Sequence, residues 1–165
     1  MSAKLRILVG VLAVTIPLDQ ISKLWIDSHL PRGERLAVID GFFYLTHVRN
    51  PGGAFGAFAS ASEGLRLVAF IVVSAIALTV IAVLFYRLAP GDRLQALGLG
   101  LILGGVTGNF IDRVLPARGE VIDLLHFRLW DGYRWPDFNF ADIFVLLGLT
   151  ALIVELLSRE GQDRV

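Results

Sequence analysis

The chain has 165 residues, of which 55% are hydrophobic and 18% are charged. A soluble core of this size cannot bury that much apolar surface, so the composition predicts a protein that contacts lipid. The 15 basic and 15 acidic residues balance to zero net charge, which gives no reason to expect nucleic acid as a partner, and the absence of cysteine excludes disulfides and cysteine-ligated metals.

Four apolar segments meet the requirement of about 20 residues for a membrane-spanning helix. They cover roughly residues 5–26, 65–88, 94–115 and 138–157. We predict an all-α membrane protein in which residues 1–165 form a single domain, with outward loops at 27–64 and 116–137. The first segment has the basic start of a signal peptide but no small-x-small cleavage site after it, so we expect it to remain as the first helix.

Basic residues beside the segments bear on their orientation. They flank the two termini and the short middle loop, at Lys4, Arg6, Arg87, Arg93, Arg159 and Arg164. By the positive-inside rule these parts are cytoplasmic, although the long loops carry arginines too. We favour cytoplasmic termini because the middle loop is very short and the arginines of a folded loop weigh little in this rule.

The first long loop carries a hairpin signal, because Asp40 and Gly41 separate two runs with strand-forming residues. The second long loop repeats the signal at Asp131 and Gly132. Residues 54–66 are small and amphipathic, which is typical of a helix that lies on the membrane surface. We therefore expect a small extracytoplasmic β-sheet, or cradle, and a short interfacial helix on the outer face.

Two charged side chains lie inside the first segment. Asp19 and Lys23 are four residues apart and share one helix face, where they can neutralise each other as an ion pair. A complementary pair suits a structural contact between helices, and an intramembrane charge also suits a functional site. The sequence leaves both roles open.

The third segment carries glycine at every fourth position, at Gly100, Gly104 and Gly108. This spacing gives a face that another helix backbone can approach closely. Asn109 and Arg113 follow at helical spacing near the end of the segment. The arginine can extend to the membrane interface, or it can act with the asparagine to hold carboxylates or a peptide carbonyl.

The fourth segment begins with FNFAD, in which Asn139 and Asp142 resemble a helix capping box. A second acid, Asp123, follows the third segment. Gly132 and Pro136 break any continuous helix between the two acids, so the loop can fold back and bring both carboxylates together. Two facing acids would form an aspartyl-protease dyad, in which one stays protonated and the other takes a proton from water.

Other hydrolytic mechanisms find less support. The three histidines, His29, His47 and His126, are scattered without an HExxH motif, which argues against a zinc peptidase, and no GxSxG elbow occurs. His126 lies three residues from Asp123 and could pair with it, but we interpret it as an ordinary surface residue of an alternating strand. The two aspartates are the stronger candidates.

Five sequence blocks occur in order along the chain: DQISK at 19–23, NPGGAF at 50–55, GGVTGNFIDR at 104–113, VID at 121–123 and FNFAD at 138–142. Together they resemble bacterial lipoprotein signal peptidase, or signal peptidase II, over nearly all of the chain. Any one block is a weak signal, but five in order are hard to obtain by chance.

The resemblance implies that Asp123 and Asp142 form the catalytic dyad. It implies a role in substrate binding or dyad support for Asn50, Gly52, Asn109, Arg113, Asn139 and Ala141. Asp19 and Lys23 match family positions that support the fold or the site, and we interpret them as a structural polar pair. The chain departs from the family pattern at Gly53, Gly56 and Leu124, which bears on substrate preference and leaves the acids in place.

The implied substrate is a prolipoprotein with a diacylglyceryl-modified cysteine, cut at the peptide bond before that cysteine. The resemblance implies a multi-pass protein of the bacterial cytoplasmic (inner) membrane, with its active site at the outer face and membrane lipid as a partner. It also implies inhibition by cyclic peptides of the globomycin type, and it requires no metal or organic cofactor.

Two other classes of protein fit some of these features. A small proton- or ion-coupled transporter would use Asp19, Lys23, Asp112 and Arg113 as a relay, but the acids cluster on one side and no inverted repeat occurs. A structural membrane scaffold would need only capped helices. Cleavage of a lipid-modified precursor in detergent distinguishes the peptidase from both alternatives.

Overall fold

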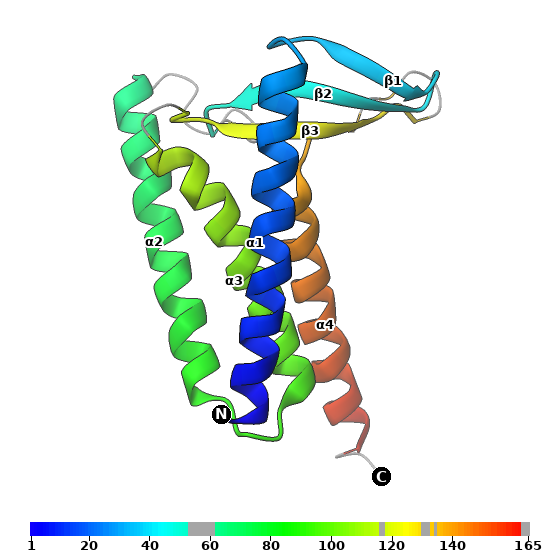
Figure 1. Cartoon of the computed structure of the whole chain (residues 1–165). Coiled ribbons are helices and arrows are strands. Elements are labelled where there is room, and N and C mark those ends of the chain that lie inside the picture. Colours follow the sequence, from blue (N-terminus) through cyan, green and yellow to red (C-terminus); the bar gives the residue numbers. More distant parts are fainter. Residues whose placement is uncertain (53–61, 116–117, 130–132, 134, 163–165) are drawn as a thin grey trace.

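Four helices form a bundle, and a small sheet lies across one end of it (Figure 1). The elements in chain order are α1 (Ala3–His29), β1 (Arg35–Ile39), β2 (Phe43–Asn50), α2 (Glu63–Arg87), α3 (Arg93–Val114), β3 (Val121–Phe127) and α4 (Phe140–Gln162). The structure, a computed structural model, describes residues 1–52, 62–115, 118–129, 133 and 135–162. Helix α1 begins and α4 ends at the end of the bundle farthest from the sheet (Figure 1).

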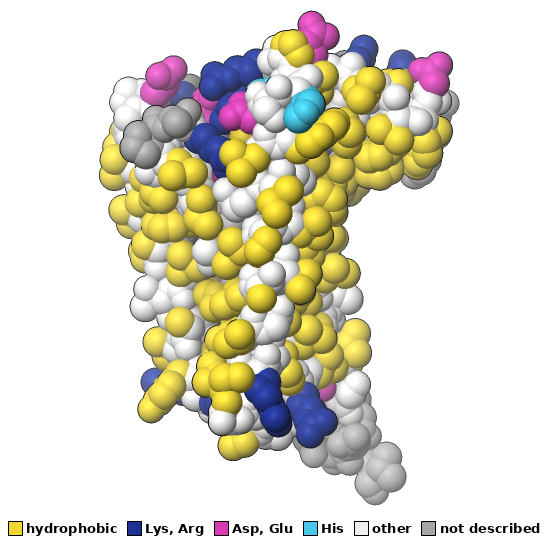
Figure 2. All heavy atoms as spheres, in the orientation of Figure 1, with side chains coloured by type: hydrophobic (Ala, Val, Ile, Leu, Met, Phe, Trp, Pro, Cys, Tyr) yellow, Lys and Arg dark blue, Asp and Glu magenta, His cyan; other side chains and the backbone are white. Residues whose placement is uncertain are grey.

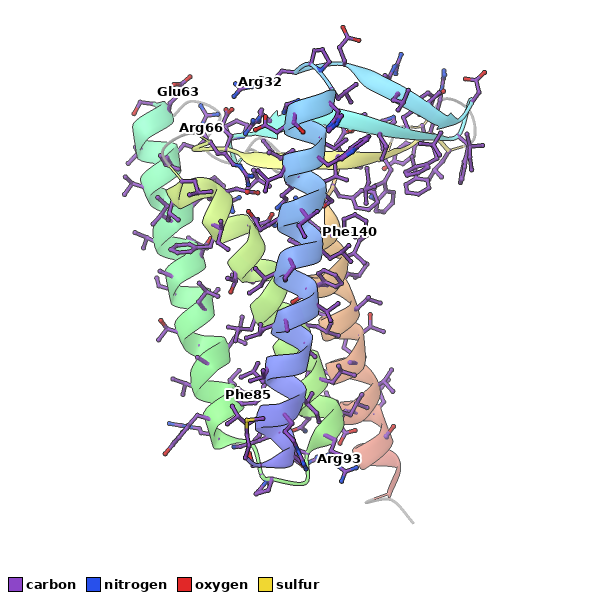
Figure 3. All side chains as sticks on the ribbon, viewed as in Figure 1. Arg32, Glu63, Arg66, Phe85, Arg93 and Phe140 are labelled. Carbon is purple, nitrogen blue, oxygen red and sulfur yellow. The ribbon has the colours of Figure 1, made fainter. Side chains whose placement is uncertain are left out.

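All four helices are long and apolar enough to cross a membrane. Apolar side chains cover much of the visible flank of the bundle, and charged side chains gather at its two ends (Figure 2). Arg93 marks one end, and Arg32, Glu63 and Arg66 mark the other (Figure 3). Lipid is the solvent that suits such an apolar flank, so the prediction of a helical membrane protein with four spans is confirmed.

Helix α3 packs against α1, α2 and α4. Its glycines allow this close approach. A Cβ atom on Gly108 would lie 2.4 Å from Oδ2 of Asp19 in α1, and a Cβ atom on Gly105 would lie 2.3 Å from the carbonyl oxygen of Ala141 in α4. The predicted glycine face is confirmed, and a second one on the same helix receives α4.

Gly105→Ala should destabilise the protein, because the added Cβ atom would meet the backbone of Ala141 rather than a flexible side chain. Overpacking of this kind typically costs about 1–3 kcal/mol, so we expect the melting temperature in detergent to fall by several degrees. Gly10→Ala is the matched control, since nothing lies within 4 Å of a Cβ atom there. Equal melting temperatures for the two variants would contradict the close contact between α3 and α4.

The sheet is antiparallel, with the strand order β1-β2-β3. Strands β1 and β2 form the predicted hairpin, and Gly41 takes a φ of 77° in the turn between them, which glycine adopts without strain. Strand β3 comes from the connection between α3 and α4 and pairs Val121 with Asn50 and Asp123 with Val48. This pairing carries Asp123 to the end of the bundle where α4 begins.

Two predictions for the long loops fall largely outside the described residues. The first is the second hairpin, whose centre, Asp131 and Gly132, is not described. Beside it, the Leu129 amide donates to the Tyr133 carbonyl at 2.8 Å. The second is the interfacial helix, most of which lies in residues 53–61, and these residues, with Gly53 and Gly56 among them, are not described. Residues 63–66, the end of that predicted helix, form the first turn of α2, because Ser62 caps the longer helix there.

Candidate active site

The N-terminus of α4 carries the asparagine and the aspartate of the FNFAD sequence. The Asp142 amide donates to Oδ1 of Asn139 at 3.1 Å, and the Asn139 amide donates to Oδ2 of Asp142 at 3.1 Å. This reciprocal pair satisfies amides that the first turn of a helix otherwise leaves without partners. The predicted capping box is therefore present, and it holds the Asp142 carboxylate where the helix dipole stabilises negative charge.

The same asparagine reaches the second acid. Asn139 is fully buried, and its Nδ2 donates to Oδ1 of Asp123 at 2.8 Å and to the Ile122 carbonyl at 3.3 Å. Asn139 thus contacts Asp123 through its side chain and Asp142 through its backbone. The structure brings the two predicted acids together around one residue.

Strand β2 holds the other oxygen of Asp123. Oδ2 of Asp123 accepts a hydrogen bond from Nδ2 of Asn50 at 3.0 Å, and Oδ1 of Asn50 accepts one from the Gly52 amide at 2.9 Å. Gly52 has a φ of 94°, and a Cβ atom there would lie 2.2 Å from the Phe70 ring. Glycine suits both the backbone conformation and the available space, so Gly52 can orient the Asn50 amide.

Asn109 of α3 contacts the other acid. Its Nδ2 donates to Oδ1 of Asp142 at 2.9 Å, and its Oδ1 accepts from Nζ of Lys23 at 3.0 Å and from Nδ2 of Asn139 at 3.2 Å. An ammonium group can only donate, so Oδ1 of Asn109 faces Lys23. The Nδ2 group of the same amide must then face Asp142.

Lys23 lies between two carboxylates. Its Nζ is 2.8 Å from Oδ2 of Asp19 and 2.7 Å from Oδ2 of Asp112, and all three side chains are fully buried. Oδ1 of Asp19 accepts a hydrogen bond from the Ala141 amide at 3.0 Å, which ties α1 to the first turn of α4. The ion pair predicted within α1 is present, and it belongs to a larger network that reaches the two acids through Asn109.

Arg113 extends from the end of α3 beside the acids. Its Nη1 donates to the Asn109 carbonyl at 3.2 Å, and its guanidinium lies 5.2 Å from the centre of the Phe70 ring. Its positive charge interacts with the carboxylates of Asp112, Asp142 and Asp123. This placement favours the interpretation in which Arg113 and Asn109 act together over one in which the arginine only extends to the membrane interface.

Asp123 is only 3% exposed. Burial raises the pKa of its carboxyl group from 3.8 to about 7, and the charge of Asp142 acts in the same direction. Hydrogen bonds from Asn50 and Asn139 oppose this rise because they stabilise the carboxylate. Asp123 can therefore hold a proton near neutral pH.

An apolar pocket opens beside Asp142. Its volume is about 410 Å³, and it is lined by Phe127, Leu129, Trp135, Phe138, Asp142, Ile143 and Leu146. Among the described residues of that lining, Asp142 carries the one charged group. A pocket of this kind suits an apolar ligand with a polar group near the carboxylate.

His126 pairs with a different acid from the one considered in the sequence. Its Nδ1 lies 3.2 Å from Oδ1 of Asp137, which also accepts a hydrogen bond from Thr46 at 2.9 Å. The side chain is buried, so the interpretation of His126 as a surface residue was wrong. The segment that returns from β3 toward α4 forms a bridge with the strand at Phe138, and Asp137 of this segment contacts the histidine.

Two residues of the network, Gln20 and Arg118, were not among the candidates from the sequence. Nε2 of Gln20 donates to Oδ2 of Asp19 and to the Gly108 carbonyl, both at 3.0 Å. No spacing distinguishes Gln20 from an ordinary polar residue in a helix. Asp112 was considered only for a transporter relay, although it continues the four-residue spacing of the α3 glycines, and that spacing places it on the face toward α1.

Known proteins are similar to this chain over most of its length. The family model described as signal peptidase (SPase) II matches residues 11–158. The lipoprotein signal peptidase of Geobacter sulfurreducens is 43% identical over 155 residues, which cover 94% of each chain. That of Desulforapulum autotrophicum is 39% identical over 150 residues, which cover 91% of each chain. A solved bacterial membrane enzyme is 28% identical, with a TM-score of 0.81 over 94% of this chain and 90% of its own.

These matches extend across the four helices, the sheet and both acids. They confirm the resemblance carried by the five sequence blocks, and they do not favour the transporter alternative. The chain belongs to the signal peptidase II family and is a protease of the bacterial inner membrane.

Proposed function

We propose that the protein is an aspartyl endopeptidase that removes signal peptides from diacylglyceryl-modified prolipoproteins, cutting before the modified cysteine. Its catalytic groups are the carboxyls of Asp123 and Asp142. The observation that carries this proposal is the position of Asn139, which donates from its side chain to Asp123 and from its backbone to Asp142. The substrate class is supported by the relatives, which are called lipoprotein signal peptidases.

The two acids have different surroundings, so we assign them different roles. Asp123 is buried and its pKa is raised to about 7, which makes it the proton-bearing general acid. Asp142 stands at the N-terminus of α4 and accepts hydrogen bonds from Asn109 and from the Asn139 amide. These contacts stabilise a carboxylate, which makes Asp142 the general base.

Hydrolysis then takes two steps. Asp142 takes a proton from water, the water oxygen bonds to the scissile carbonyl carbon, and the proton of Asp123 passes to the carbonyl oxygen, giving a gem-diol. Asp142 next donates its proton to the amide nitrogen, the carbon–nitrogen bond breaks, and Asp123 regains a proton from a hydroxyl of the gem-diol. The products are a carboxylic acid and the free amine of the cysteine, and both acids return to their starting states.

Neighbouring groups prepare the dyad for this reaction. The positive charge of Arg113 stabilises negative charge on the dyad and on the substrate oxygen as it develops. Asn109 and Asn50 each hold one carboxylate oxygen and so orient the two acids. The backbone amides of Gly52 and Ala141 act one step further away, since Gly52 orients Asn50 and Ala141 ties the start of α4 to α1.

The sheet end of the bundle is the outer face in this proposal, and both termini are cytoplasmic. Phe140, beside the dyad in sequence, lies just beneath the sheet (Figure 3). The peptide bond would meet the dyad at this level while the acyl chains of the cysteine stay in the outer leaflet. The pocket of about 410 Å³ beside Asp142 would take an apolar part of the substrate, and an inhibitor of the globomycin type would compete for this region.

Incubation of the purified protein with a lipid-modified precursor in detergent tests this function. We expect a shorter product on a gel, and we expect a precursor with an unmodified cysteine to remain largely intact. Equal cleavage of the two precursors would contradict the proposed substrate class. Coupled ion uptake into vesicles without cleavage of either precursor would favour the transporter.

Activity should form a bell against pH where chemistry limits the rate, because only the singly protonated dyad supplies both an acid and a base. Deprotonation of Asp123 removes the acid, so we expect the upper limb at about pH 7. Asn50→Ala removes a hydrogen bond that lowers the pKa of Asp123, so this pKa should rise and the upper limb should move to higher pH. The measurement is kcat/KM across pH with a soluble lipopeptide. A limb that moves to lower pH in this variant would show that Asp123 does not hold the proton.

A further inference from the structure

Arg118 lies in the turn that follows α3. The Arg118 and Gly119 amides donate to the Leu115 carbonyl at 2.9 and 3.1 Å, and the Arg118 side chain is only 6% exposed. Nη1 of Arg118 donates to Oδ1 of Asp112 and to Oε1 of Gln20, the latter at 3.0 Å. The arginine therefore connects the turn before β3 to both α3 and α1.

Arg118 also completes a neutral cluster of charges. Asp19 and Asp112 are its two acids, and Lys23 and Arg118 are its two bases. The side chains of Asp19, Lys23 and Asp112 are fully buried in the bundle. An unbalanced charge in such a low-dielectric interior is strongly unfavourable, so the neutrality of the cluster depends on the arginine.

Lys23 carries the effect of this balance to the active site. Its ammonium group has three donors and lies within 3.0 Å of Asp19, Asp112 and Oδ1 of Asn109. The contact with Asn109 holds that amide in the orientation in which Nδ2 donates to Asp142. A change that draws Lys23 away from Asn109 leaves the longer contact from Nδ2 of Asn139, at 3.2 Å, to hold Oδ1, so the amide is held less firmly in this orientation.

We propose that Arg118 is a positioning residue for the reaction. It neutralises Asp112, so Lys23 can also contact Asn109. The Asn109 amide then holds the Asp142 carboxylate in its working orientation. This inference rests on the proposed role of Asp142. Without the arginine, Lys23 would be the one cation within 4 Å of Asp112 among the described residues, although the charge of Arg113 also acts on that acid, and its ammonium would be drawn toward Asp112. The Asn109 amide would then be held at Oδ1 by Asn139 without the help of Lys23, and its hydrogen bond to the base would weaken.

Charge-changing variants test the proposal through kcat and KM for a lipopeptide substrate. Arg118→Gln should lower kcat by about tenfold or more while KM stays within about twofold, because a misplaced base impairs the reaction more than binding. Arg118→Lys should keep most of the activity, since one nitrogen makes both contacts and an ammonium can replace it. The double variant Asp112→Asn/Arg118→Gln restores neutrality and should return kcat to within about threefold of the wild type.

Arg159→Gln is the matched control, because Arg159 pairs with Asp92 and Glu155 at the other end of the bundle. It should leave kcat unchanged. An unchanged kcat in Arg118→Gln, or a loss that the double variant does not recover, would overturn the proposal. If Arg118→Gln does not fold, the double variant tests the proposal in its place. A double variant that folds and is active supports the role of charge balance, and one that folds but is impaired refutes it.

Asp142→Asn in the same assay separates this inference from the proposed function. If Asp142→Asn still cleaves, the dyad assignment fails, and the role of Arg118 fails with it. If Asp142→Asn is inactive while Arg118→Gln has normal kcat, the dyad stands and the inference about Arg118 alone is refuted.

Discussion

Asp142→Asn and Asp123→Asn are each expected to abolish cleavage of a lipid-modified precursor. Asparagine keeps the size of aspartate, but its amide can neither take the proton of the attacking water nor supply one to the scissile bond. General acid–base catalysis contributes about 10²- to 10⁴-fold, and both steps of this reaction pass through the two acids, so the rate should fall by at least that factor. The measurement is the initial rate of product formation by the purified variants.

This loss has to be separated from misfolding. An asparagine at position 142 can still accept the Asn139 amide through its side-chain oxygen, so α4 should stay capped and the melting temperature should stay near that of the wild type. Asp137→Asn is the matched control, because Asp137 pairs with His126 and lies outside the dyad. Near-normal processing by a well-folded Asp123→Asn or Asp142→Asn protein would refute the dyad assignment.

Asp19→Ala should act mainly on stability. It removes one of the two carboxylates that flank Lys23, and it removes the acceptor for the Ala141 amide. Breaking a fully buried ion pair typically costs about 3–5 kcal/mol, so we expect a large drop in the melting temperature in detergent. Stability should be the more affected property, and the kcat of the protein that remains folded the less affected one, because Asp19 contacts neither acid of the dyad.

Asp19→Asn separates the charge from the hydrogen bond. It keeps an oxygen for the Ala141 amide and fills the same space, so its melting temperature should fall between those of the wild type and Asp19→Ala. If Asp19→Ala melts like the wild type and yet does not cleave, Asp19 belongs to the catalytic machinery and its structural role is refuted.

The parts of the fold that sequence predicts well are those that depend on nearby residues. Apolar length is enough to locate the four spans, and Asp40 with Gly41 is enough to locate the first hairpin. The reciprocal cap of Asn139 and Asp142 is equally local, since its partners are three residues apart. The start of α2 was harder, because small and polar residues around Ser62 suit both an interfacial helix and a capped span.

The strand that carries Asp123 shows why the parts of the fold that depend on distant residues were less predictable. Strand β3 is buried along nearly its whole length, so it lacks the alternation of apolar and polar residues that marks a strand with one solvated face. His126 was misplaced for the same reason. The meeting of Asp123 with Asp142 depends on the pairing of β3 with β2, which no local pattern determines.

The ion network shows the same limit. The contact between Lys23 and Asp19 follows from helical spacing, but the contacts of Lys23 with Asp112 and Asn109 depend on how α3 packs against α1. The contact of Arg118 with Gln20 joins a turn to a distant helix, and no spacing rule relates the two positions. Glycine spacing on α3 does predict a close helix contact, without naming the partner.

In the proposed reaction, two aspartates activate water to cut one bond, before a lipid-modified cysteine. Mass spectrometry of the products formed by the purified protein from a diacylglyceryl-modified precursor, in water labelled with heavy oxygen, tests it most directly. The expected products are a signal peptide with the label in its new carboxyl group and a mature peptide that begins with the modified cysteine. Cleavage at another bond, or label that first enters Asp123 or Asp142 in a single turnover, would contradict the account.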